Sequence, residues 1–126
     1  MTHASSHPLM ILVAGPYRSG TGDDPVKIEA NMQKLEAAAL TVFRAGHIPI
    51  IGEWVALPLM RRAGSKAMGD AVWDEMQYPT AARLIAHCDA VLRLEGDSKG
   101  ADEDVRQAKE RGLPVYRSME QIPAAS

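Results

Sequence analysis

Short apolar runs alternate along the chain with longer segments in which apolar residues recur every three or four positions. The first run, residues 9–14, contains no polar residue and ends at Gly15-Pro16. An unbroken apolar run indicates a strand that is buried on both faces, as in the middle of a parallel sheet. Comparable runs predict further strands near residues 47–51, 89–94 and 113–116.

Two segments between these runs carry clear helical signals. Asp24-Pro25 pairs an N-cap residue with proline at the first helical position. The apolar residues that follow are spaced by four and three: Ile28, Met32, Leu35, Ala39 and Val42. This spacing predicts a long helix with one apolar face, which ends at Gly46. A second helix is expected to begin after Ser98 and to end at Gly112.

Residues 53–80 are harder to interpret. Their apolar residues suggest a short helix, but Pro58 lies within it and is expected to interrupt it. Residues 63–66 indicate a loop, and a helix is expected to resume near Asp70.

The resulting order β-α-β-α-β-α-β predicts an α/β fold with a doubly wound parallel sheet of four to five strands. Helices should cover both faces, as in flavodoxin-like and Rossmann-like folds. We expect one domain over residues 9–122, preceded by a flexible segment over residues 1–8. Ligands bind such sheets in the crevice at the carboxyl ends of the strands. The polar, glycine-containing loops at residues 15–24 and 95–101 lie at those ends.

Composition narrows the choice of partners. The chain has 126 residues, of which 46% are hydrophobic and 24% charged, with a formal net charge of −2. This charge gives no general attraction to nucleic acids or anionic membranes, so neither is expected as a partner. The single cysteine, Cys88, excludes an intrachain disulfide, and no metal-ligand spacing links it to the four histidines. Without a signal peptide or an apolar run of membrane-spanning length, we expect a cytoplasmic protein.

The two loops carry the candidate chemistry. Residues 15–22 can offer backbone amides, hydroxyls and the Arg18 guanidinium to an anion. No lysine follows Gly20, which excludes a Walker phosphate loop, and a Rossmann fingerprint is absent. The alternative is a glycine-rich connection that requires unusual backbone angles.

The second loop leads into three consecutive acidic residues, which can simply complement the helix dipole. Helical spacing directs Glu103 to solvent and puts Asp102 and Asp104 on opposite flanks. Asp104 leans towards the crevice, and near a helix amino end we expect it to stay ionised, as suits a nucleophile.

Four short motifs occur in a set order along the chain. They are Ala14-Gly15-Pro16-Tyr17, Arg44-Ala45-Gly46-His47, Cys88-Asp89-Ala90-Val91 and Ser98-x-Gly100-Ala101. Together they resemble the nucleoside 2-deoxyribosyltransferase-like superfamily, in particular its small bacterial branch. The resemblance extends over residues 9–117.

This resemblance implies cleavage or transfer of the N-glycosidic bond of a nucleoside or nucleoside 5′-monophosphate through a carboxylate nucleophile. The matching catalytic residues are Asp104, as the nucleophile, and Tyr17, which positions it. The matching substrate-binding residues are Gly15, Arg18, Ser19, Gly20, Ser98 and Gly100, with Arg18 and Ser98 on the phosphate. No metal or organic cofactor is expected, because a carboxylate alone can trap or stabilise an oxocarbenium-like sugar.

The sequence departs from the family pattern at two positions. Asp104 stands where the family has the longer glutamate, and Ala81 stands where it tends to carry an aspartate. A non-catalytic nucleotide-binding domain of the same fold is therefore the main alternative. A third reading is an interaction module that uses residues 53–78. With two tryptophans and three methionines, this segment predicts a homodimer or a larger ring of dimers.

Overall fold

Four parallel strands in the order β2-β1-β3-β4 form the central sheet of the structure, a computed structural model that describes residues 7–125. The elements, in chain order, are β1 (Met10–Ala14), α1 (Pro25–Arg44), β2 (Ile48–Ile50), α2 (Gly52–Arg62), α3 (Ala71–Ile85), β3 (Ala90–Arg93), α4 (Lys99–Glu110), β4 (Val115–Tyr116) and the 3-10 helix η1 (Met119–Gln121). The predicted α/β fold and its parallel sheet are confirmed.

Strand β1 lies in the middle of the sheet and pairs with β2 on one side and β3 on the other. Met10 lies opposite Ile48, and Leu12 lies opposite Val91. The chain therefore moves to one side of β1 for its second strand and to the other side for its third. In doubly wound sheets such a switch in strand order opens a crevice at the carboxyl ends of the strands.

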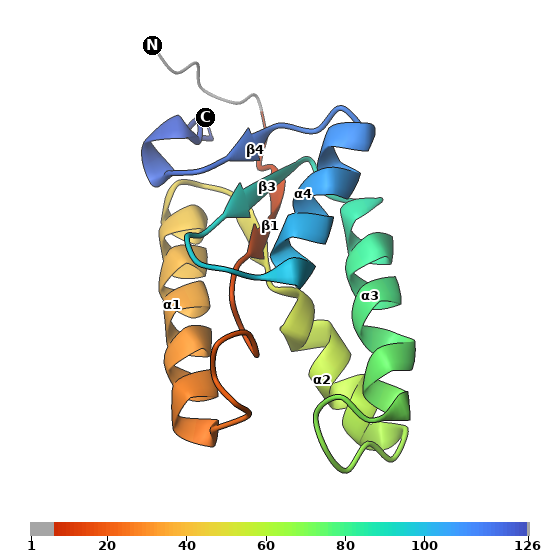
Figure 1. Ribbon diagram of the computed structural model, residues 1–126. Helices are drawn as coiled ribbons and strands as arrows, with labels where there is room; N and C mark the ends of the chain where they lie inside the picture. Colours follow the sequence, from red (N-terminus) through yellow and green to blue (C-terminus); the bar gives the residue numbers. More distant parts are fainter. Residues whose placement is uncertain (1–6, 126) are drawn as a thin grey trace.

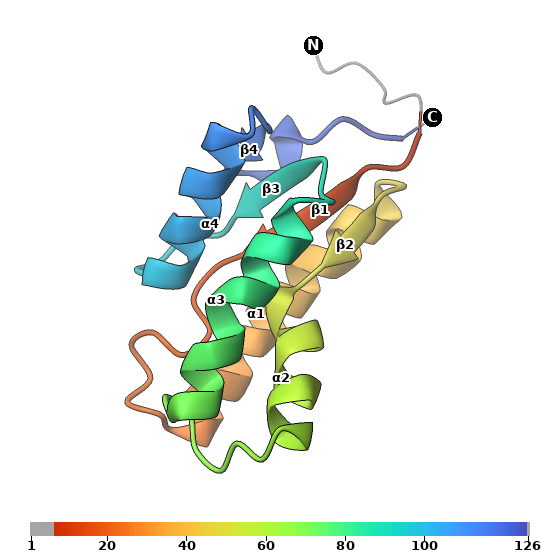
Figure 2. The same cartoon turned by 90° about the vertical axis from the view of Figure 1, so that its right-hand side faces the viewer.

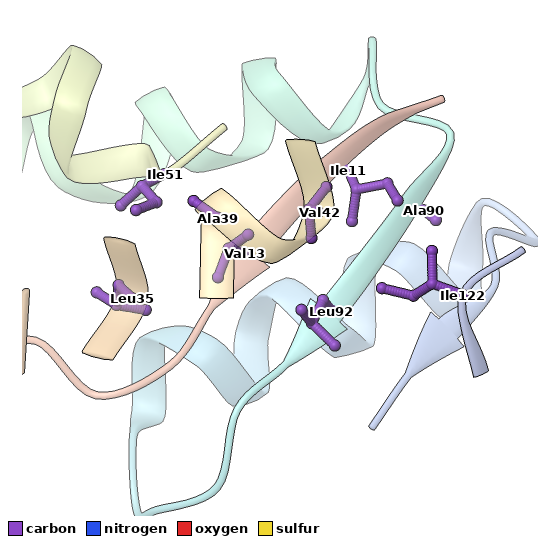
Figure 3. Close-up of a cluster of buried hydrophobic side chains, with 9 residues drawn as sticks. All are labelled: Ile11, Val13, Leu35, Ala39, Val42, Ile51, Ala90, Leu92 and Ile122. Carbon is purple, nitrogen blue, oxygen red and sulfur yellow. The ribbon is translucent and has the colours of Figure 1, made fainter. Parts of the chain in front are cut away.

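Alternate side chains of the strands pack against helices on the two faces of the sheet. Ile11 and Val13 of β1 pack with Leu35, Ala39 and Val42 of α1, in the cluster drawn in Figure 3. On the opposite face, Leu12 and Ala14 belong to a second cluster with residues of α3 and α4. Figure 1 shows α1 on one side of the sheet and α3 and α4 on the other. A period of two along β1 thus builds both halves of the core.

Helices α2 and α3 run side by side beyond the carboxyl end of β2 (Figure 2). The expected interruption at Pro58 is wrong, because α2 continues through this residue. A mid-helix proline costs the helix one hydrogen bond. Here packing offsets that cost, since Ala56 and Met60 are buried against Trp73 of α3. The predicted start of α3 is confirmed, because the Asp70 side chain accepts a hydrogen bond from the Trp73 amide, 2.9 Å away.

The last described residues pack beside the start of the sheet. The Ala125 amide donates to the Ala45 carbonyl oxygen, 2.9 Å away. His47, which is buried, accepts at Nδ1 from the Leu9 amide (2.9 Å) and donates from Nε2 to the Pro123 carbonyl oxygen. The domain therefore continues to residue 125. Most of the expected flexible segment, residues 1–6, lies outside the described residues.

Within the described chain, no helix combines the length and the apolar character required to cross a membrane.

Candidate functional site

A cavity of about 520 Å³ lies at the carboxyl ends of β1 and β3, at the switch in strand order. Its walls come from the 15–24 loop, from α2 and α3, and from the start of α4. All eight residues that the sequence analysis assigned to a site line this one cavity: Gly15, Tyr17, Arg18, Ser19, Gly20, Ser98, Gly100 and Asp104. Residues 80 positions apart in the sequence are therefore neighbours around one space.

Two glycines allow the loops after β1 and β3 to approach each other closely. Gly96 has a φ of 113°, and a Cβ placed there would lie 2.7 Å from Cγ of Pro16. A Cβ on Gly15 would lie 3.0 Å from Cβ of Leu94. Side chains at these positions would push the loops apart. The close contact of the two loops fixes one rim of the cavity.

Arg18 reaches from the 15–24 loop to the opposite wall. Its Nε and one terminal nitrogen donate to the two carboxylate oxygens of Asp23, at 2.7 and 3.1 Å. The guanidinium carbon lies 5.8 Å from the centre of the Trp73 ring, and the group lies against Gly69. The hydrogen-bonded Arg18 guanidinium lowers the pKa of Asp23. Arg18 is therefore already paired before any ligand arrives.

Backbone donors gather on both loops at this rim. The backbone N–H groups of Ser19 and Gly20 have no acceptor within residues 7–125. Ser98 is the N-cap of α4, and its buried hydroxyl accepts from the Ala101 amide, 3.1 Å away. This hydroxyl still has its own proton to donate. Glycine-rich turns and helix amino ends both present such groups to anions.

Asp104, in the second turn of α4, is half-buried and lines the cavity. No group among residues 7–125 forms a hydrogen bond or ion pair with its carboxylate. Burial, followed by the negative charges of Glu53 and Glu103, raises its pKa to about 7, and the charge of Arg93 opposes this. The expectation that Asp104 stays ionised is wrong, because burial and like charges outweigh the helix amino end. Near neutral pH about half of these carboxyl groups carry a proton.

The two neighbouring acidic residues are held elsewhere. Glu103 forms an ion pair with Arg106 on the same helix, which lowers its pKa to about 2. Asp102 accepts from Arg93 at 2.8 Å. Neither residue is among those that line the cavity. The helical spacing therefore separated Asp104 from its two neighbours, but it is Asp102 that is exposed, whereas Glu103, expected to face solvent, is partly covered.

Tyr17 lines the same cavity as Asp104. The Asn31 side chain donates to the Tyr17 carbonyl oxygen at 2.8 Å, which fixes the backbone after β1. Burial, and then the charges of Glu53 and Glu29, raise the pKa of the phenol, so it keeps its proton at neutral pH. Across the described chain, no hydrogen bond joins Tyr17 and Asp104.

Glu53, in the first turn of α2, is a further cavity residue that was not predicted from the sequence. It is half-buried, lines the cavity, and has its pKa raised by burial, with a hydrogen bond from its own backbone amide opposing the shift. A signal was available, because Glu53 follows a parallel strand in the same way as the two loops that were chosen. Glu53 was not predicted because the secondary structure of residues 53–80 was uncertain from the sequence.

An apolar and aromatic wall was missed as well. Ala56, Leu57 and Met60 of α2 line the cavity together with Trp73 of α3, against which they pack. Trp73 Nε1 donates to Oε1 of Gln77 at 2.7 Å, which fixes the orientation of the indole. A planar, partly apolar group fits a wall of this kind.

Residues 7–125 hold no group of three or more His, Cys, Asp or Glu side chains arranged to bind a metal ion. The cavity instead combines donors suited to an anion, an apolar wall and half-buried carboxyl groups. No protein-family model matches this chain, and no curated protein matches it.

Proposed function

We propose that the protein cleaves or transfers the N-glycosidic bond of a nucleoside or a nucleoside 5′-monophosphate. The convergence of all eight predicted site residues on one cavity carries this proposal. Asp104 acts as the nucleophile, and Tyr17 positions it. The apolar wall and the polar rim lie around the same space as Asp104, as a ligand with an apolar base and an anionic group requires.

The distribution of groups suggests how such a substrate is held. The base packs against Trp73 and the apolar residues of α2. The phosphate lies against Ser98 and the free amides of the 15–24 loop, and Arg18, which lies over the Trp73 ring, supplies a further donor between the phosphate and the base. The sugar then lies between the base and the phosphate, beside Asp104.

Cleavage of the N-glycosidic bond needs few groups besides Asp104, Tyr17 and the residues that hold the substrate. The ionised Asp104 carboxylate attacks the anomeric carbon as the bond to the base breaks, or stabilises the positive charge that develops there. The protonated Tyr17 phenol can donate a hydrogen bond that orients this carboxylate. A hydrolase passes the sugar to water, and a transferase passes it to a second base.

The test is Asp104→Asn, assayed by chromatography of free base after long incubations with a panel of nucleosides and their 5′-monophosphates. The amide keeps the shape of the side chain but cannot attack, so base release should be lost. Ligand affinity, measured by calorimetry, should stay within a few fold. Glu103→Gln is the matched control: Arg106 holds that carboxylate away from the cavity, so base release should persist, with the pKa of Asp104 lowered because one negative charge is removed. Equal base release by Asp104→Asn and the unchanged protein would exclude Asp104 as the nucleophile.

A non-catalytic nucleotide-binding domain is the second candidate. The protonation of Asp104 favours it, since a pKa of about 7 leaves fewer carboxylates ready to attack at neutral pH. The shorter side chain acts in the same direction, because a misplacement of about 1 Å can cost roughly a hundredfold in rate. Tight binding with no base release above the Asp104→Asn background would establish this alternative.

A further inference from the structure

A second carboxyl group, that of Glu53, lines the same cavity as Asp104. The two residues are about 50 positions apart in the sequence and belong to different helices, α2 and α4. Within residues 7–125, no side chain pairs with either carboxyl group. Two half-buried carboxyl groups without side-chain partners in one cavity suggest a role beyond structural support, although Glu53 accepts from its own backbone amide.

We propose that Glu53 donates the proton to the departing base and that it shares a single proton with Asp104. This inference rests on the proposed N-glycosidic cleavage and adds a second catalytic residue to it. Asp104 attacks the sugar while Glu53 acts on the base.

The positions along the two helices assign these roles. Glu53 lies one turn before Ala56 and Leu57, which belong to the apolar wall against which the base packs. Asp104 follows Ser98 and Gly100 at the start of α4, where the proposed function places the phosphate. Glu53 is thus beside the base and Asp104 beside the sugar.

The charges around the pair favour one shared proton. The charge of Glu53 is the largest charge effect among those that raise the pKa of Asp104 to about 7. Burial raises the pKa of Glu53 itself. Ionising both carboxyl groups therefore places two negative charges in one partly desolvated cavity, and retaining one proton avoids this.

Other titratable and charged groups also face or adjoin the pair. They are Tyr17, Arg18 and Asp23 of the 15–24 loop, Glu29 of α1, Arg61 of α2, Tyr78 of α3, Cys88 and Arg93 beside and on β3, Asp97, and Lys99 and Glu103 of α4. Arg18 is committed to Asp23, and Arg93 to Asp102. Neither arginine forms an ion pair with Glu53 or Asp104.

The reaction balances with these groups and water. An Asp104 oxygen bonds to the anomeric carbon, the carbon–nitrogen bond breaks, and its electron pair leaves with the base. The proton of Glu53 passes to the base. Water then attacks the same carbon and gives its proton to Glu53, while the bond to Asp104 breaks and returns its electron pair to the carboxylate. Both residues are restored, and the products are the free base and the sugar.

The pH dependence of base release separates the pair from a lone nucleophile. If the two groups act as a pair, the active form holds one proton, which is lost as the pH rises through about 7. Base release should then pass through a maximum below that pH and fall above it. If Asp104 acts alone, base release should instead rise through about pH 7 to a plateau. The slopes between pH 6.5 and 8 have opposite signs.

Glu53→Gln tests the inference directly, with Glu29→Gln as the matched control. Glu29 also faces Tyr17 but does not line the cavity. Glu53→Gln should lower kcat about a hundredfold or more, because the amide cannot give up a proton. It should also abolish the fall above pH 7. The Asp104 titration, followed by carboxyl-carbon NMR, should move to lower pH, whereas Glu29→Gln should leave the rate and this titration unchanged.

These outcomes separate the two proposals. Loss of base release in Asp104→Asn, with an unchanged rate and pH profile in Glu53→Gln, would overturn the role of Glu53 and leave the proposed function intact. A lower rate in Glu53→Gln without movement of the Asp104 titration would indicate a merely structural role and would also overturn it. No base release by the unchanged protein at any pH would overturn both proposals.

Discussion

In the free protein, Asp23 both positions the Arg18 guanidinium and offsets part of its charge. This guanidinium is held by both oxygens of Asp23 and lies over the Trp73 ring. These contacts keep the side chain along the cavity wall, where an incoming phosphate can reach it. They also mean that a phosphate must share the guanidinium with a carboxylate that repels it. Arg18 is therefore prepositioned, but its charge is partly offset.

Arg18→Ala should weaken the binding of a nucleoside 5′-monophosphate by about tenfold or more, since hydrogen bonds to charged groups contribute roughly 1.5–3 kcal/mol. Binding of the free nucleoside should change little. Calorimetry with both ligands measures the difference. Asp23→Asn is the informative counterpart, because it removes the competing charge and should tighten monophosphate binding. Equal losses for the two ligands in Arg18→Ala would remove the phosphate assignment.

The sequence predicted correctly that the site residues gather around one space, but it did not predict the ionisation state of Asp104. The helical spacing correctly separated Glu103 from Asp104, because direction on a helix follows from residue number alone. The pKa of Asp104 depends on burial by the surrounding elements and on Glu53, a residue 51 positions earlier in the chain. No local pattern contains that information. The pairing of Arg18 with Asp23, five residues later in the same loop, has a different reason: an irregular loop has no fixed spacing that determines which side chains meet.

At the scale of elements, the four strands and the helices α1 and α4 could be predicted because each carries its own signal. The strands are short apolar runs, and the helices have caps and a regular apolar face. Helices α2 and α3 each contain a proline and are stabilised by mutual packing around Met60 and Trp73. Their continuity is a tertiary property, so the local pattern of residues 53–80 was misleading at Pro58.

Pro58→Ala should stabilise the protein. Alanine restores an amide that can donate to the Trp54 carbonyl oxygen, and it removes a ring that crowds the preceding turn. The gain should be about 1–2 kcal/mol, since the cost of a mid-helix proline is partly offset by its effect on the unfolded chain. Urea unfolding followed by circular dichroism measures it. Pro114→Ala, outside any helix, should give no gain, and a loss of stability in Pro58→Ala would contradict this account of α2.

At the scale of the whole molecule, packing within the chain removes part of the apolar surface that the sequence suggested. Trp73 and Met60 are 4% and 2% exposed, because they are buried between α2 and α3. What remains on these helices is Trp54, Leu59 and Tyr78, each between 39% and 50% exposed. A second apolar area lies on α1 and β2, where Leu40, Phe43 and Ile48 are exposed. The molecule thus presents two candidate faces for self-association.

We expect a homodimer in solution that forms through the face of α2 and α3. Leu59 is half exposed on a helix whose other side is buried in the chain, and Tyr78 and Trp54, whose indole donates to Glu36 of α1, are further large side chains of α2 and α3 that stay exposed, of the kind that favour interfaces. Leu59→Arg should therefore shift the protein to monomer at micromolar concentration, as measured by light scattering after size-exclusion chromatography. Phe43→Arg is the matched control on α1, where 65% of the residue is exposed. If Phe43→Arg dissociates the dimer and Leu59→Arg does not, the interface lies on α1. If the unchanged protein elutes with the mass of one chain, the expected association is wrong, and the face of α2 and α3 is an ordinary surface beside the cavity.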